Sequence, residues 1–258
     1  MNAQEMQMQF NELLEITRAS YETFLTTTES VMRAKRPSVL AVDEDKEDPE
    51  KIALDMATYN AAPVVAVPMY SEFAPLVENG HRFLLATDGL YLEVRRPWLH
   101  LIHRLVEQPG TVRIPYGPLV GKMEFGYGRL GTAIPQMKEF AAHALAASPI
   151  EAAGSLVWNH VTSEWALKYP KTIGEATTGS IQYEQVELGE NESLVVDLHS
   201  HGAHPAFFSP TDDADDAGSV KICGVLGSLD KDVKTAAFRL CVLGVYLPIN
   251  VPADKIFG

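Results

Sequence analysis

Short β-rich runs separated by turn signals dominate the chain from about Ala62 onward, and they constrain the fold more than any other feature of the sequence. Asp88-Gly89 lies between two of these runs, HRFLLAT and LYLEVRR, and predicts a hairpin turn. The other runs are VVAVPMY, GSLVWN, WALKYP, SIQYEQVEL, SLVVDLH, VKICGVLGSL and TAAFRLCVLGVYLPI. The last two are long and apolar enough to be central strands of a mixed sheet.

Helical spacing of apolar residues occurs in three segments. The first forty residues predict one or two amphipathic helices, with apolar positions at Phe10, Leu13, Leu14, Ile16, Tyr21, Phe24 and Leu25. Residues 97–108, PWLHLIHRLVEQ, begin with a proline and are followed by Pro109-Gly110. This pattern predicts a helix over residues 97–108. A third is predicted at IPQMKEFAAHALAAS. The expected fold class is therefore α/β or α+β, a mixed sheet flanked by helices, with a smaller N-terminal α+β portion.

The charge of the chain argues against nucleic acid as a direct ligand. The 34 acidic and 21 basic residues give a formal net charge of −13, and no long Lys/Arg stripe offsets the repulsion of a phosphate backbone. The first residues contain no basic segment followed by an apolar one, and nowhere do some 18 apolar residues follow one another without a charge. We therefore expect a cytoplasmic protein that does not bind membranes.

The chain has two cysteines, Cys223 and Cys241, and each lies inside an apolar strand-like run. This number excludes a disulfide scaffold and a cysteine-rich structural metal site. Both side chains are expected to be buried, reduced thiols.

The segment DLHSHGAHPAFFSPTDD, residues 197–213, contains the side chains best suited to metal chemistry. Because side chains alternate along a strand, His199 and His201 project from the same face and both imidazoles can reach one ion. Catalytic zinc sites take three protein ligands and leave the fourth position to water. The candidates for the third ligand are His204 and the aspartates at 212, 213, 215 and 216.

The tetrapeptide SPTD, which starts at Ser209, predicts the beginning of a short helix. Pro210 would take the first helical position, and Asp212 the third position of a capping box with Ser209. A capping box alone explains these residues without a metal, whereas its closeness to the two histidines favours a metal site. Calcium at DDADD is the other alternative, but the glycine and distant glutamate of a calcium loop are missing. His204 is expected to lie outside the ligand set.

A second histidine pair, His100 and His103, stands three residues apart in the helix predicted at 97–108. This spacing would place both on one helix face, but no acidic or thiol partner accompanies them. Packing is the favoured interpretation, as it is for Trp158 and Trp165 on adjoining strands.

The spacing H-x-H-x7-S-x2-D resembles that of the JAMM (MPN/Jab, in prokaryotes Prok-JAB) zinc metallopeptidases. Pro149, Glu151 and Gly154 in PIEAAGSLVWN are similar to a second motif of this family, P-x-E-x-x-G before an apolar strand. Gly202 follows the second histidine where many members have proline. The resemblance covers residues 125–258, and residues 64–250 also resemble a protein family of the bacterial PRTRC gene cassette.

The resemblance implies roles for five residues. His199, His201 and Asp212 would bind Zn²⁺, Glu151 would accept a proton from the bound water, and Ser209 would donate a hydrogen bond to the oxyanion. The sequence pattern predicts a helical segment with an acidic linker at 1–50 and a small α+β domain at 51–124, and the resemblance implies an MPN/JAB-type metallopeptidase domain at 125–258.

The implied function is zinc-dependent hydrolysis of a peptide or isopeptide bond. The cassette implies a ubiquitin-like protein or its conjugates as substrate, and an E1-like (ThiF-related) protein as a partner. Two alternatives stay open: a non-catalytic MPN scaffold, and a zinc amidase acting on a small peptide.

Overall fold

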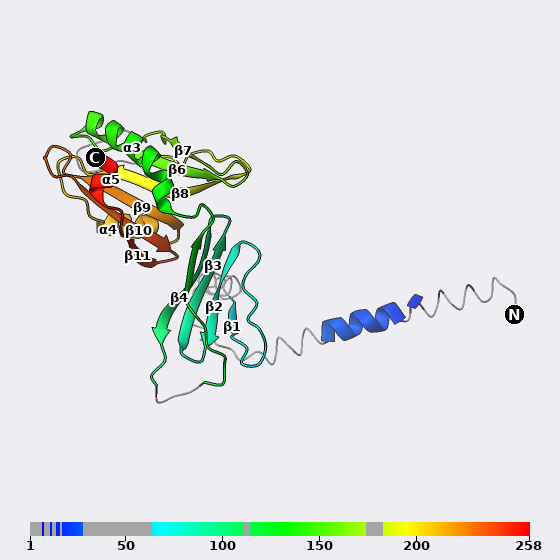
Figure 1. Cartoon of the computed structure of the whole chain (residues 1–258). Coiled ribbons are helices and arrows are strands. Elements are labelled where there is room, and N and C mark those ends of the chain that lie inside the picture. Colours follow the sequence, from blue (N-terminus) through cyan, green and yellow to red (C-terminus); the bar gives the residue numbers. More distant parts are fainter. Residues whose placement is uncertain are drawn as a thin grey trace, which may run out of the picture. The chain divides into compact units, whose positions relative to one another are not determined.

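The computed structural model describes residues 7, 11, 14, 15, 17–27, 63–110, 114–173 and 183–258 (Figure 1). The chain divides into two compact units, Met1–Tyr59 and Asn60–Gly258. In the first unit, residues 17–27 are helical, as the apolar spacing predicts, and every one of them is exposed. The predicted acidic linker, whose sequence VDEDKEDPEK occupies residues 42–51, lies outside the described residues. No helix within the described ranges is both long enough and apolar enough to cross a membrane.

The second unit begins with a five-stranded sheet in the order β1-β2-β3-β4-β5. Its strands are β1 (Val64–Ala66), β2 (Gly80–Ala86), β3 (Gly89–Arg96), β4 (Leu99–Glu107) and β5 (Lys122–Phe125). The predicted hairpin at Asp88-Gly89 is confirmed, since β2 and β3 pair antiparallel with Ala86 opposite Gly89.

The helix predicted at 97–108 is wrong, because these residues form a two-residue turn followed by β4. Strand β4 pairs with β3 on one side and β5 on the other, and its first half is buried on both faces. His100 and His103 therefore point to opposite faces and cannot share an ion. The His100 ring instead lies 3.0 Å from a carboxylate oxygen of the buried Glu93.

A six-stranded mixed sheet follows, in the order β11-β10-β9-β8-β6-β7. Its strands are β6 (Ala153–Asn159), β7 (Glu164–Lys168), β8 (Glu192–Ser200), β9 (Val220–Gly227), β10 (Thr235–Val242) and β11 (Val245–Ile249). The helical elements are η1 (Leu130–Ala133), α3 (Ile134–Ala147), α4 (Pro210–Asp216) and α5 (Ala253–Phe257). Only β8 and β9 run parallel in this sheet. The predicted fold class, a mixed sheet flanked by helices, is confirmed.

Two strand predictions need correction. Residues 235–249 were expected to form one strand, but they form the hairpin of β10 and β11, which turns at Leu243-Gly244. The run SIQYEQVEL forms no strand in its described part, residues 183–188, where Tyr183 makes an isolated bridge to Thr172. The predicted domain boundaries at 50/51 and 124/125 stay predictions.

The two faces of the six-stranded sheet differ in chemistry. On one face α3 packs its buried residues Met137, Phe140, Ala141 and Ala144. A side chain at Gly154 would lie 2.6 Å from the Phe140 ring, so helix and strand approach closely there. The opposite face carries Asp197 on β8, Cys223 on β9 and Arg239 on β10 in register. Helix α4 covers part of this polar face through its contacts with Arg239.

An extra residue in β8 extends the polar face along the strand. Val196 pairs with Leu156 and Leu194 pairs with Val157, so Val195 forms a bulge. Because the bulge shifts the alternation by one residue, Leu194 shares a face with Asp197 and with the two histidines. The bulge therefore joins an apolar side chain to the polar face.

Candidate metal centre

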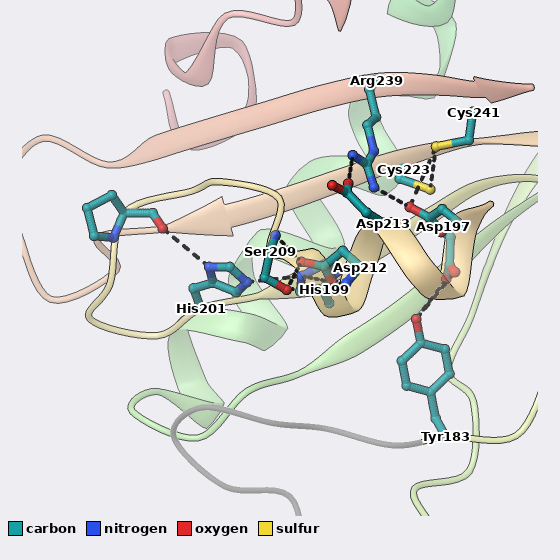
Figure 2. Close-up of polar contacts among 12 residues, drawn as sticks. Tyr183, Asp197, His199, His201, Ser209, Asp212, Asp213, Cys223, Arg239 and Cys241 are labelled. Carbon is teal, nitrogen blue, oxygen red and sulfur yellow. Dashed lines mark hydrogen bonds and ion pairs between the residues drawn. The ribbon is translucent and has the colours of Figure 1, made fainter. Parts of the chain in front are cut away.

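The two histidines lie at the end of β8 with their rings facing each other. Their Nε2 atoms are 3.1 Å apart (Figure 2). The Nδ1 atom of His201 lies 3.3 Å from the carbonyl oxygen of Pro205, which fits an N–H donated to that carbonyl. In this tautomer the Nε2 atom of a neutral His201 carries the lone pair that a metal ligand requires.

The predicted capping box is confirmed at the start of α4. Ser209 is the N-cap, Pro210 is the first helical residue and Asp212 is the third. One carboxylate oxygen of Asp212, Oδ2, accepts from the Ser209 amide at 2.6 Å and from its hydroxyl at 2.7 Å. The other oxygen, Oδ1, lies 3.5 Å from Nε2 of His199. The cap therefore fixes one oxygen and leaves the other directed at the histidines.

The donor atoms of His199, His201 and Asp212 all lie within 4.8 Å of one another. Donor atoms at ~2.0–2.1 Å from a tetrahedral zinc ion would be about 3.3 Å apart, close to the 3.1 and 3.5 Å found here. Burial lowers the pKa of His199, although the charge of Asp212 opposes this shift. The neutral imidazole is the form that binds metals, so the lowered pKa of His199 and these two distances both fit a zinc site.

Glu151 lies in the short segment between α3 and β6 and is 9% exposed. Two hydrogen bonds fasten this segment to the end of β8: the Ala152 amide donates to the Ser200 hydroxyl, and the Ser200 amide donates to the Ala152 carbonyl, each at 2.9 Å. Burial, and then the negative charge of Asp212, raises the pKa of Glu151 to about 7. A carboxyl group of this pKa is suited to accepting and returning a proton near neutral pH.

Gly202 lets the chain after the histidines approach the glutamate segment. Its φ is +53°, and a Cβ atom built on it would lie 2.5 Å from the Pro149 carbonyl oxygen. Proline, with φ fixed near −65°, cannot adopt this conformation. The departure from the H-x-H-P pattern therefore corresponds to a different turn, which lies directly against the segment bearing Glu151.

A cavity of about 690 Å³ contains all five predicted site residues in its lining. These are Glu151, His199, His201, Ser209 and Asp212. The lining also includes the apolar side chains of Ile173, Val186 and Leu194. The volume lies within the ~300–1,000 Å³ range of ligand sites, so a short peptide segment can be accommodated.

Next to the site, charged residues of alternating sign connect the sheet with α4. Lys221 on β9 lies 2.7 Å from Asp197 and 3.1 Å from Asp216, and Arg239 lies 2.9 Å from Asp216. Asp216 also forms a second group of metal-type ligands with Cys223 and Cys241, whose sulfur atoms are 3.4 Å apart. The two cations already neutralise this carboxylate, so this group does not resemble a cation site. Both thiols are buried and free, as predicted.

The remaining predicted residues have structural positions. His204 is exposed and is absent from the lining of the cavity. Trp158 and Trp165 are paired across β6 and β7 with ring centroids 5.1 Å apart, which confirms cross-strand packing.

Sequence reasoning missed three residues that support the site: Ser200, Lys221 and Arg239. Each has a visible signal, because a hydroxyl stands at a core position of β8 and a single cation stands in each of two apolar strands. Their partners, however, are distant in the sequence.

Two family models match parts of the chain. Residues 52–126 match a domain of unknown function (DUF2016), and residues 134–241 match Prok-JAB, the prokaryotic homologs of the JAB domain. A search of curated proteins gave no match. The Prok-JAB match begins with α3 and ends within β10, so it includes all five residues of the candidate site. The match identifies residues 134–241 as a JAB-like domain.

Proposed function

We propose that this protein is a zinc-dependent hydrolase of peptide or isopeptide bonds. The observation that carries the proposal is the convergence of three ligand atoms within 4.8 Å, with Glu151 lining the same cavity. His199, His201 and Asp212 would hold the ion. A non-catalytic JAB domain has no need of this ligand set or of a buried glutamate beside it.

Bound zinc would supply Lewis acidity and lower the pKa of a water molecule from 15.7 to about 7. Glu151 would accept the proton of the attacking water and deliver it to the leaving amine, since its pKa lies near neutral. A bound cation would lower this pKa, which keeps the carboxylate ready to accept the proton. Because Glu151 is buried, bulk water would have little access to its carboxylate during the proton transfer.

Ser209 would stabilise the oxyanion that forms on the substrate carbonyl. Its hydroxyl donates to Asp212 in this structure, so the hydroxyl must rotate toward the substrate to take this role. The Ser209 amide also donates to Asp212 and can hold that carboxylate meanwhile. Removing one oxyanion donor from a hydrolase typically costs about 3 kcal/mol of transition-state stabilisation.

For the substrate, we propose a ubiquitin-like protein or its conjugates in a bacterial PRTRC-type cassette, with an E1-like protein as a partner and a cytoplasmic location. The support is the resemblance of residues 64–250 to a cassette protein family. The cavity, which has both polar and apolar lining, fits an extended peptide segment next to the bond that is cut. An amidase acting on a small peptide would use the same chemistry.

The test is to measure zinc content and cleavage of ubiquitin-like fusions and small amides by the wild type and by Glu151→Gln. The variant should keep about one zinc ion per chain but lose at least ~100-fold in kcat, because general acid–base catalysis is worth ~10²–10⁴. Glu164→Gln, on the exposed part of β7, is the matched control and should cleave normally.

The substrates distinguish the candidate functions. Cleavage of small amides alone would support the amidase. A zinc-loaded wild type that cuts nothing but binds a cassette protein would support the scaffold and contradict the proposal.

A further inference from the structure

Arg239 is a cation on the polar face of the six-stranded sheet, under α4. It lies in β10 opposite Cys223, and it is 6% exposed. Its neighbours along the strand, Phe238 and Leu240, are buried in the core. An arginine at this depth requires partners that compensate for its desolvation.

Those partners come from α4 and from the segments on either side of it. One terminal nitrogen of Arg239 binds the carboxylate of Asp213 (Figure 2), and the other binds that of Asp216. The guanidinium lies 3.9 Å from the centroid of the Phe208 ring and 4.1 Å from that of Tyr246. Tyr246 in turn donates from its hydroxyl to the Asp213 carbonyl at 2.6 Å. One side chain thus contacts the helix, the residue before its N-cap and the edge strand.

Helix α4 depends on this contact more than an ordinary helix would. It has seven residues, which is too short to be stable without tertiary contacts. Four of the seven are aspartates, and none is basic. Aspartates in the last turn oppose the helix dipole and repel each other. The cations that offset this charge, Arg239 and Lys221, both lie on the sheet.

Asp212, the proposed third ligand, is adjacent to Asp213 in this helix. Its Oδ1 atom must stay near the two histidines. The helix is tied to the sheet by the contacts of Asp213 and Asp216 with Arg239, of Asp216 with Lys221 and of the Asp213 carbonyl with Tyr246. We propose that Arg239 is a positioning residue that holds Asp212 where it can bind the cation together with His199 and His201. This inference rests on the proposed zinc site.

The sign of the expected effect separates positioning from simple electrostatics. A positive charge near the site repels a divalent cation, so its removal alone should tighten zinc binding or leave it unchanged. If Arg239 acts by holding α4, its removal should weaken zinc binding instead. Residues outside the ligand shell that orient ligands are typically worth ~10–100-fold in metal affinity.

The experiment measures zinc affinity of the full chain by competition with a chelating dye, and the absorption spectrum of the Co²⁺ form. Arg239→Met should bind zinc at least ~10-fold more weakly and change the Co²⁺ bands, which report ligand geometry. Arg239→Lys keeps the charge but cannot bind two carboxylates in a fork, so it should lose several-fold. His199→Ala, which lacks one proposed ligand, measures how much zinc binds to the chain outside the candidate site.

The matched control is Arg82→Met. Arg82 also pairs with a buried carboxylate, Glu93 at 2.7 Å, and lies over the Phe73 ring, but it belongs to the five-stranded sheet. This variant should be destabilised and yet bind zinc as the wild type does. Circular dichroism of the metal-free proteins checks that each variant is folded, and Arg239→Lys decides the outcome if Arg239→Met does not fold.

Folded Arg239 variants that bind zinc as tightly as the wild type, with an unchanged Co²⁺ spectrum, would overturn the inference and leave the proposed function intact. A wild type that binds no more zinc than His199→Ala would overturn the proposed function itself, and the inference with it.

Discussion

At the scale of single residues, Gly202 controls how closely the two sequence motifs of the site approach each other. It follows His201 directly, and its backbone lies against the Pro149 carbonyl, two residues before Glu151. The left-handed conformation and the lack of a side chain are both required there. A glycine that looked like a departure from the family pattern is therefore part of the mechanism that positions the glutamate.

Gly202→Ala should lower the free energy of unfolding by ~1–3 kcal/mol, because a Cβ atom strains the left-handed backbone and collides with the Pro149 carbonyl. Urea denaturation of the metal-free protein measures this change. Gly218→Ala is the control, since a Cβ atom there meets nothing within 4 Å. Equal stability of the two variants would show that the turn can relax at no cost.

At the scale of elements, the N-terminus of α4 combines a helix cap with a ligand. The hydrogen bonds between Ser209 and Asp212 stabilise the first turn, and the same bonds direct Oδ1 of Asp212 toward His199. A capping box and a metal site are therefore not alternatives at this position. The cap orients the carboxylate that the site would use.

Ser209→Ala should cost ~1 kcal/mol of stability through loss of the cap and should weaken zinc binding several-fold through loss of the Asp212 orientation. Ser209→Thr should restore both. The control is Ser219→Ala at the other end of the helix, where the hydroxyl donates to the Asp216 carbonyl at 2.8 Å. It should reduce stability without changing zinc affinity, and parallel losses of zinc affinity in both variants would argue against a specific role of the cap.

The elements that sequence could predict are those whose signals are local. Asp88-Gly89 specifies a hairpin and Pro135 lies in the first turn of α3. The alternation of β8, continued to the residue that follows it, places His199 and His201 on one face. The strand β4 could not be predicted in this way, because Pro97 fits the start of a helix and the strand has apolar residues on both faces. Pairing with β3 and β5 decided its structure. The role of Arg239 could not be predicted either, because its partners on α4 are more than twenty positions away in the sequence.

At the scale of the whole molecule, the site lowers the stability of the metal-free protein. The pKa of Glu151 is about 7, against an ordinary value of 4.5. The native state therefore holds this proton more tightly than the unfolded chain does. The stability that this group contributes is therefore full below about pH 4.5 and is lost as the pH rises through about 7.

In metal-free protein, Glu151→Gln should therefore be more stable than the wild type at pH 8, by ~1–3 kcal/mol, and nearly equal to it at pH 5. Urea denaturation in the presence of a chelator measures the difference at both pH values. Excess zinc should reduce the advantage of the variant, because a cation favours the charged glutamate. A difference that does not change with pH would contradict the raised pKa.

Along the bulged strand β8, positions that build the core alternate with positions that line the cavity. After Val195, the side chains of Val196 and Leu198 are buried in the core, whereas those of Asp197 and His199 line the cavity of the candidate site. A substitution at the first kind of position should destabilise the fold, whereas one at the second should leave a folded protein without its proposed activity. Deletion of the inserted residue would leave Leu194 opposite Val157 and keep both sets of side chains on their faces, so the bulge lets β8 hold one residue more than its partner strand without exchanging core and cavity.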